Sequence, residues 1–262
     1  MVITILGIMA SLAVPALKNL GKANVQTSAS RQLLDDFGRA RQLAISDHTT
    51  VFMVFLSTNF WAPADNPNWA NTLNNTQLTA LTNLLGLQMN GYTFIAYGAL
   101  GDQPGQHQWH YLEPWQSLPQ NFMIAPWKFA PAPSTTRTFF QDPINGNSFT
   151  VFPFDTTNDI PFPTETNANS TVTLPYIAFN YLGQLVSSAN DLDVAGNGAD
   201  IPLAQGSVGY ALDPSTKMPT RDLVGANAVA ESPVGNSTNV TYNIVHIDAL
   251  TGRATLEFHQ VQ

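Results

Sequence analysis

The feature that most constrains this chain is an uncharged, apolar run at its start, MVITILGIMASLAVPAL, over residues 1–17. A helix over this run is about 26 Å long at about 1.5 Å per residue, slightly shorter than the roughly 30 Å hydrocarbon core of a membrane. Because it is apolar on every side, such a helix needs lipid or other apolar helices around it. We therefore predict a membrane-inserting helix that Pro15 interrupts.

Two other interpretations of the run are open at this stage. A secretory signal peptide begins with a basic region, whereas the first basic residue here is Lys18. A buried core helix needs several apolar helices as neighbours, and the remaining sequence offers no such set. Both interpretations fit the sequence less well than a membrane anchor does.

The helix is predicted to continue beyond the apolar run as an amphipathic one. Its apolar face carries residues spaced by three or four, namely Leu33, Phe37, Ala40 and Ala44, with Leu34 and Ile45 beside them. Opposite charges four residues apart, Arg31 with Asp35 and Asp35 with Arg39, favour this helix by a few tenths of a kcal/mol each. The helix is expected to end near Asp47 and His48, and its apolar stripe is suited to pack on a sheet.

The apolar run resembles the N-terminal helix of type IV pilins and type II secretion pseudopilins. The pairs Leu33-Leu34, Ala40-Arg41 and Ala44-Ile45, followed by a β-branched and aromatic strand at residues 50–56, are similar to the minor H-type pseudopilins and the fimbrial T-type minor pilins. Two later stretches fit the same class: a strand–turn–strand at residues 177–185, around Gly183, and a turn into the last strand at residues 247–253.

This resemblance implies an α+β fold, in which a long N-terminal helix with a membrane half and an amphipathic half packs on an antiparallel β-sheet head with long loops. The helix is expected over residues 1–48, with its membrane or filament-core segment at 1–17, and the head over residues 49–262. The family also carries a basic leader, a small residue, Phe-Thr-Leu and a Glu before the apolar run. None of these is in the sequence, so we expect the leader and the first residues of the mature helix to precede Met1.

The resemblance further implies a structural role, as a minor pilin or pseudopilin of a type IV pilus or a type II secretion-type filament. Its partners would be other pilin or pseudopilin subunits, the inner-membrane assembly machinery and, before assembly, membrane lipid. The expected location is the bacterial inner membrane with the head outside the cytoplasm, and then a periplasmic or cell-surface filament. The side chains expected to insert in the membrane and join the filament are Val2, Ile3, Ile5, Leu6, Ile8, Leu12, Val14, Pro15 and Leu17.

Composition narrows the function of the head. The net charge is −8, the pI is about 4.8 and charged residues are only 11% of the chain, which gives no basic patch for a phosphate backbone and argues against nucleic acid. The chain has no Cys, which excludes disulfides and thiolate metal sites. Nucleophile elbows, phosphate-binding glycine loops and zinc-protease motifs are also missing from the sequence, so an enzyme is not expected.

The head is predicted to contain one more helix and several strands. A short capped helix is expected at residues 75–87, strands broken by proline at residues 108–124 and 148–154, and loops at residues 155–171 and 187–206. Alternating apolar residues at 240–247 and 254–261 predict a closing hairpin. Val245, Ile247, Leu256 and Phe258 should then face the core.

All five tryptophans lie between residues 61 and 127. Such a cluster either packs inserted segments onto the sheet or offers a ligand or partner surface, for which Trp109 and Trp115 are the candidates. The alternative function is therefore a membrane-tethered adhesive or glycan-binding head that uses this Trp-rich insert.

One loop is a candidate for calcium, the only cofactor that we consider for this chain. Residues 190–200 carry carboxylate and amide oxygens with glycines between them, and Asp191, Asp193, Asn197 and Asp200 are the candidate ligands. The loop is not an EF-hand, because Ala195 and Pro202 stand where oxygen ligands belong. The same residues also suit an ordinary turn in which Asp and Asn side chains bond the backbone.

Overall fold

The computed structural model describes residues 2–62, 68–98, 102, 107–129, 138–141, 148–156, 159–165, 171–187, 198–216, 229–239 and 243–258. Within these ranges, the side chains of residues 2–24, 138–141, 148–150, 238–239, 243 and 258 are not described. Helices occur together with sheets in which every strand pairing is antiparallel. This confirms the α+β class expected from the sequence.

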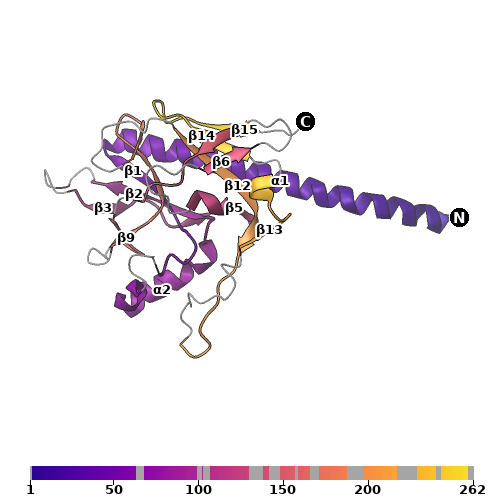
Figure 1. The fold of residues 1–262 in the computed structure, drawn as a ribbon, viewed down its shortest axis with the longest axis horizontal. Coiled ribbons are helices and arrows are strands. Elements are labelled where there is room, and N and C mark those ends of the chain that lie inside the picture. The colour runs from indigo at the N-terminus through magenta and orange to yellow at the C-terminus, as the bar shows by residue number, and fades with distance from the viewer. Residues whose placement is uncertain are drawn as a thin grey trace.

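The chain begins with a long helix, α1, over Val2–Asp47, followed by strand β1 at Thr50–Phe55. Both the predicted end of the helix and the predicted first strand are confirmed. Figure 1 shows the N-terminal part of α1 extending away from the rest of the molecule, while its C-terminal part runs along the strands. The two parts of one helix therefore have different surroundings.

The larger sheet has the order β11-β10-β1-β2-β3, and β4 also pairs with β2. Its strands other than β1 are β2 (Gly91–Tyr97), β3 (Trp109–Tyr111), β4 (Gln116–Ser117), β10 (Tyr176–Phe179) and β11 (Leu185–Val186). Met53 of β1 lies opposite Phe94 on one side and Ile177 on the other. The strand–turn–strand around Gly183 is thus β10–β11, as predicted. The predicted strand segment at 108–124 is divided into β3, β4 and a third strand, β5 (Phe122–Ile124).

The second sheet has the order β13-β12-β14-β15, with β5 also paired to β12. Its strands are β5 (Phe122–Ile124), β12 (Ala199–Val208), β13 (Val229–Glu231), β14 (Asn243–Ile247) and β15 (Ala254–Phe258). The closing hairpin is confirmed as β14–β15. Two small hairpins complete the strands of the described residues: β6 (Thr138–Gln141) pairs with β7 (Ser148–Val151), and β8 (Asp159–Pro161) pairs with β9 (Thr171–Thr173).

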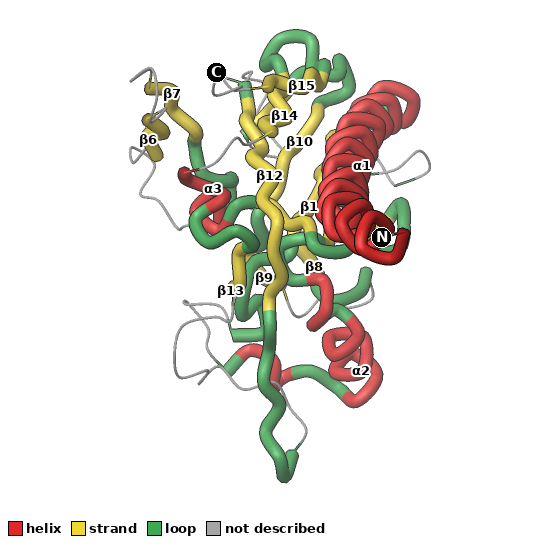
Figure 2. The backbone as a smooth tube through the Cα atoms, turned by 90° about the vertical axis from the view of Figure 1, so that its right-hand side faces the viewer, coloured by secondary structure: helices red, strands yellow, loops and turns green. Residues whose placement is uncertain are grey.

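The other helices in the described ranges are short. They are α2 (Asn75–Asn83), α3 (Asn236–Asn239) and the 3-10 turns η1 (Trp69–Thr72), η2 (Leu85–Leu87) and η3 (Pro126–Phe129). The predicted helix at 75–87 is confirmed as α2 and η2. Asn74 caps α2, because its side chain accepts from the Gln77 backbone N–H while the Gln77 side chain accepts from the Asn74 N–H. Figure 2 shows α1 alongside the strands and α2 apart from it.

Two segments predicted as loops contain strands, and this prediction was wrong. The segment 155–171 contains β8 and the first residue of β9, and the segment 187–206 contains most of β12. Pro202 lacks an N–H donor and is unfavourable inside a sheet, yet its carbonyl accepts from Ala125 N–H at 2.9 Å. Pairing with β14 and β5 therefore produces a central strand that local propensity does not favour.

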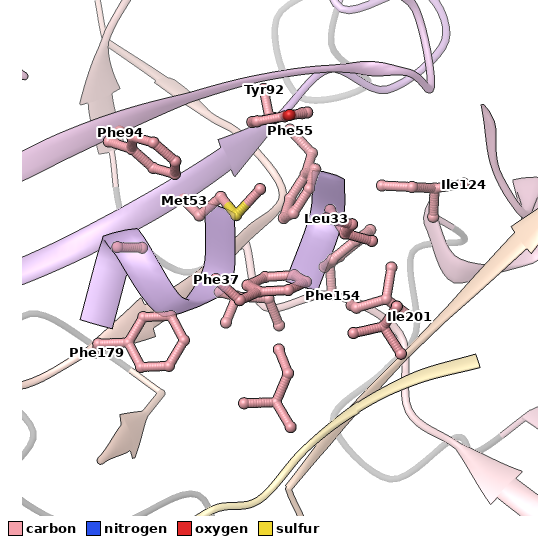
Figure 3. Close-up of a cluster of buried hydrophobic side chains, with 14 of the residues drawn as sticks. Leu33, Phe37, Met53, Phe55, Tyr92, Phe94, Ile124, Phe154, Phe179 and Ile201 are labelled. Atoms are coloured by element: carbon pink, nitrogen blue, oxygen red, sulfur yellow. The ribbon is translucent and has the colours of Figure 1, made fainter. Parts of the chain in front are cut away.

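The apolar stripe of α1 forms one side of the main core. Ala29, Leu33, Phe37, Ala40 and Ala44 are fully buried, as the predicted stripe requires. They share one cluster with side chains of both sheets, including Met53, Phe55, Ile201 and Val245. Figure 3 shows Phe37 in the middle of this cluster, with Phe55 and Phe179 each 6.5 Å away between ring centroids. Val245 and Ile247 are also in this core, Leu256 is partly buried against it, and the side chain of Phe258 lies outside the described residues.

The opposite face of the larger sheet is also covered. Phe52, Val54 and Leu56 of β1 belong to a second cluster that includes Trp61, Trp69 and Leu81. The larger sheet is thus buried on both faces, by α1 on one and by the segment before and within α2 on the other. This explains why residues 50–56 are a continuous apolar run and not an alternating one.

Candidate functional site

The contacts between α1 and the head decide whether the helix and the head form one rigid unit. Asp36, on the buried side of α1, accepts a hydrogen bond from the Tyr92 hydroxyl of β2. Gln32 donates from Nε2 to the same hydroxyl at 2.6 Å and to the Ser117 carbonyl at 2.9 Å. Burial raises the pKa of the Asp36 carboxyl and of the Tyr92 hydroxyl. This polar network ties the helix to β2 and β4 beside the apolar core.

Arg39 adds an ion pair between the helix and the head. Its guanidinium contacts the carboxylate of Glu113, which also accepts from Gln116 Nε2 at 2.6 Å. Within the described residues, Asp35 is not in an ion pair with either Arg31 or Arg39. Arg39 therefore pairs with Glu113 of the head and not, as the sequence had predicted, with Asp35 of its own helix.

Arg41 fastens the helix to two turns at the end of the head. Its Nε donates to the Thr251 carbonyl at 2.7 Å and to the Gly183 carbonyl at 3.3 Å. The two turns also touch through their backbones, since Leu185 N–H donates to the Ala249 carbonyl at 3.0 Å. Gly252 has φ +60 and a Cβ there would collide with the Gly183 carbonyl oxygen. The two stretches that carried the family resemblance therefore meet at the same place on α1.

Arg41→Ala should lower the free energy of unfolding by about 1.5–3 kcal/mol, because it removes hydrogen bonds from a charged donor to two backbone carbonyls. Thermal melting followed by circular dichroism measures this loss. The matched control is Arg31→Ala, which removes an exposed cation from the same helix and should change stability by less than about 0.5 kcal/mol. Equal effects of the two substitutions would contradict the role given to Arg41.

The nine residues predicted to insert in a membrane or filament core belong to the N-terminal part of α1. Only the helical backbone is described there, because the side chains of residues 2–24 are outside the described set. In the part of the chain whose side chains are described, none of the helices combines the length and the hydropathy of a membrane span. The first described side chain beyond this part is Val25, which is exposed.

The tryptophans mostly pack inside the head. Trp61 and Trp69 are buried, and Trp69 lies 5.5 Å from Phe162 between ring centroids. Trp109 and Trp115 are partly buried. The ring centroid of Trp109 is 5.1 Å from that of Phe52, and the ring centroid of Trp115 is 5.8 Å from that of Phe162. The indole N–H groups of Trp61, Trp69 and Trp115 are buried and have no hydrogen-bond partner within the described part of the chain.

Trp115 also lines an open pocket of about 390 Å³. The other lining residues are Tyr111, Leu112, Glu113, Pro114, Pro163, Thr164 and Glu165. The ring of His110 lies between two carboxylates. Its Nδ1 is 3.0 Å from Oε1 of Glu165, and its Nε2 is 3.3 Å from Oδ1 of Asp102. The pocket therefore combines aromatic rings with carboxylates, a chemistry that can bind sugar hydroxyls.

The predicted calcium ligands are only partly described. Asp191, Asp193 and Asn197 lie outside the described residues, whereas Asp200 is at the start of β12. Its carboxylate is 2.7 Å from Nδ1 of His246 on β14. The described residues contain no group of three or more His, Asp and Glu side chains that could hold a metal ion. Asp200 is thus engaged by a neighbouring strand.

Lys128 is a buried charge that the sequence did not single out. It lies on η3, is 1% exposed, and its Nζ donates to the Phe152 carbonyl at 2.5 Å. The ammonium is also 4.8 Å from the centre of the Phe154 ring. Burial lowers the pKa of Lys128 to about 8, although Asp200 and Asp155 oppose this change. A lysine in the apolar stretch 122–129 was the only signal in the sequence.

The pKa of Lys128 predicts how stability depends on pH. The unfolded chain keeps this lysine protonated to about pH 10.5 and the folded chain only to about pH 8. Between these values the unfolded state binds more protons, so stability should rise with pH, by about 2 kcal/mol between pH 8 and 10. Above pH 10 the raised pKa values of Tyr92 and Tyr111 act in the opposite direction, since these groups ionise first in the unfolded chain.

Urea unfolding at several pH values measures this dependence. In Lys128→Met the rise between pH 8 and 10 should be absent, whereas Arg253→Met, which removes an exposed cation, should keep it. An unchanged rise in Lys128→Met would contradict the assignment.

The residues brought together in the described part of the chain thus attach a helix and line a shallow pocket, and no described cluster has the geometry of a metal site. Comparison of the chain with protein-family models, with curated proteins and with solved structures found no match.

Proposed function

We propose that this protein is a structural subunit, a minor pilin or pseudopilin, of a type IV pilus or type II secretion-type filament. The observation that carries the proposal is the unequal environment of α1 (Val2–Asp47): the head covers its stripe from Ala29 to Ala44, while the part with the apolar sequence extends outward (Figure 1). An apolar helix outside its own domain needs a non-aqueous environment. Lipid before assembly and the helices of other subunits afterwards would supply it.

The firm attachment of α1 to the head supports the same proposal. A subunit that is drawn from a membrane into a filament must transmit force between its helix and its head. Phe37 in the core, Asp36 bonded to Tyr92 and Arg41 bonded to two turns provide apolar, polar and charged contacts along the helix. The long helix and the head would therefore move together as one rigid unit. This is the finer architecture that we propose: a membrane half and a head-bound half of a single stalk.

The test is a charge placed in the apolar run. In Leu12→Asp, an aspartate near the middle of a membrane helix costs about 2.5–3.5 kcal/mol, so we expect roughly a hundredfold loss of membrane-bound protein and no sedimentable filaments. Membrane flotation and electron microscopy measure these outcomes in a host that carries the assembly machinery. Ser28→Asp is the matched control, because it adds the same charge at an exposed position of the same helix. Membrane-bound, filamentous Leu12→Asp would overturn the proposal.

The second candidate, a membrane-tethered adhesive or glycan-binding head, is favoured by one observation, the pocket beside Trp115 with its aromatic rings and carboxylates. Glycan-array binding by the full chain in detergent, lost in Trp115→Ala and retained in Trp127→Ala, would favour this function. Trp127 is a suitable control because its indole N–H bonds the Ser237 carbonyl in another part of the head. Absence of binding at glycan concentrations up to the millimolar range would leave only the structural role.

A further inference from the structure

Three large apolar side chains are exposed at one end of the head. Tyr181 and Leu182, on the turn between β10 and β11, are 43% and 57% exposed, and Leu250, on the turn between β14 and β15, is 67% exposed. These two turns are the ones that Arg41 and Gly252 hold against each other. Tyr181, Leu182 and Leu250 therefore lie on two adjacent turns that contacts with Arg41 and Gly252 hold in place. We name this exposed projection of three residues the apolar tip.

A hollow with a mostly apolar surface lies at a different place on the head. It has a volume of about 560 Å³, and its lining residues are Val25, Gln120, Asn121, Phe122, Gln205, Gly206, Ser207, Ala230, Glu231 and Ser232. These residues come from the exposed end of the packed half of α1, from β5 and the turn before it, and from β12 and β13. We name this hollow the apolar groove.

The tip and the groove lie toward opposite ends of the packed half of α1. Arg41 marks the tip and Val25 marks the groove, and about 1.5 Å per residue places these two positions about 24 Å apart along the helix. Figure 1 agrees, with the turn of the β14–β15 hairpin far from the extended part of α1 and β13 close to where that part leaves the head. A single molecule therefore cannot place its own tip in its own groove.

The charges beside the two surfaces are opposite. Arg253 follows the tip turn, is exposed, and has no ion-pair partner among the described residues. Among the described residues that line the groove, the acidic one is Glu231, whose carboxylate accepts from the Ser237 hydroxyl at 2.6 Å. A tip entering a groove would bring a cation toward this carboxylate.

We propose that the apolar tip of one copy of this chain docks in the apolar groove of a second copy, with Arg253 facing Glu231 of that copy. The occupant is a second copy because the projection, the hollow and the opposite charges are all present on the same chain. Such a contact joins two different surfaces, so each copy keeps a free tip or groove, and addition continues into an open chain. The inference deepens the proposed assembly role, on which its meaning for a filament rests.

The natural absence of Cys allows a direct test by cross-linking of the full chain in membranes or detergent. Leu250→Cys and Ala230→Cys each change an exposed residue, one at the tip and one in the groove. When the two variants are mixed and treated with a short bismaleimide, we expect at least tenfold more dimer than either variant forms alone. A chain with both substitutions should form a ladder of higher oligomers.

Thr79→Cys on α2 is the matched control, an exposed position away from both surfaces. The contact would be overturned if Leu250→Cys mixed with Ala230→Cys gives no more cross-linked dimer than Thr79→Cys mixed with Ala230→Cys. Efficient cross-linking of Leu250→Cys with itself would also overturn it, because it indicates a symmetric tip-to-tip pair. Adding Arg253→Glu to the Leu250→Cys chain should lower the yield several-fold, and an unchanged yield would refute the charge pairing.

The same samples separate this inference from the proposed function. Filaments that sediment without a tip-to-groove cross-link would refute the contact and leave the assembly role in place. A second outcome is that the cross-link forms but Leu12→Asp changes neither membrane binding nor assembly. This outcome would support the contact and contradict the proposed role of the apolar helix. Loss of both would contradict both.

Discussion

Replacing Phe37 by Asp should leave the protein without a cooperative unfolding transition. Phe37 is fully buried between α1 and the sheets, with Phe55 and Phe179 each at 6.5 Å. Removing the ring alone, as in Phe37→Ala, is expected to cost about 3–5 kcal/mol. An unpaired carboxylate in the same place adds the cost of burying a charge, and the sum approaches the whole stability of a typical domain, about 5–15 kcal/mol.

Near-ultraviolet circular dichroism of the full chain during thermal melting measures this outcome. Phe37→Leu, which keeps most of the apolar volume, should retain a cooperative transition. Arg31→Asp, which places a carboxylate on the exposed face of the same helix, should also retain it. An unchanged melting temperature for Phe37→Asp would mean that the stripe of α1 is not the core of the head.

Ending the chain at Arg253 should have the second largest effect. This truncation removes β15 (Ala254–Phe258), which pairs with β14 along its whole length and contacts α1. It exposes the N–H and C=O groups of β14 as a sheet edge and removes the apolar surface of Ala254 and Leu256 from the core. We expect a loss of several kcal/mol, an aggregation-prone product, and no cooperative melting.

A pair of point substitutions separates packing from pairing in this strand. Leu256→Asp should destabilise the protein strongly, since Leu256 packs on the core, whereas Thr255→Asp on the exposed face should have little effect. Comparable melting temperatures for these two variants, or a truncated chain that melts cooperatively, would refute the role given to β15.

The elements that the sequence predicted well are those whose pattern is local. The stripe of Leu33, Phe37, Ala40 and Ala44 repeats with the helical period, and its burial follows from that period alone. The β14–β15 hairpin is similar, because alternation and a short turn specify both strands and their pairing. The cap of α2 at Asn74 depends on residues only three apart.

The strand β12 shows why other elements could not be predicted. Its segment is rich in residues that favour turns and contains Pro202. Its partners β5 and β14 lie far away in the sequence on either side. Pairing with distant strands depends on the arrangement of the whole chain, which no local window contains.

The candidate sites divide in the same way. The sequence pointed to the tryptophans, but only the three-dimensional packing distinguishes the buried Trp61 and Trp69 from Trp115 beside a pocket. Asp200 is a candidate calcium ligand from the sequence, and only the structure shows that its carboxylate lies against His246. Lys128 has no sequence motif, because its burial results from neighbours on other segments.

The sequence by itself therefore determined the long helix, its apolar start, the stripe that packs on the head, the first strand and the closing hairpin. All of these depend on the periodicity of neighbouring residues. Only the tertiary structure decided that Asp36 bonds Tyr92, that Arg41 joins two turns, and that an apolar tip and an apolar groove lie at different ends of the head. These features depend on residues that are distant in the chain and meet only when the sheets and the helix pack together.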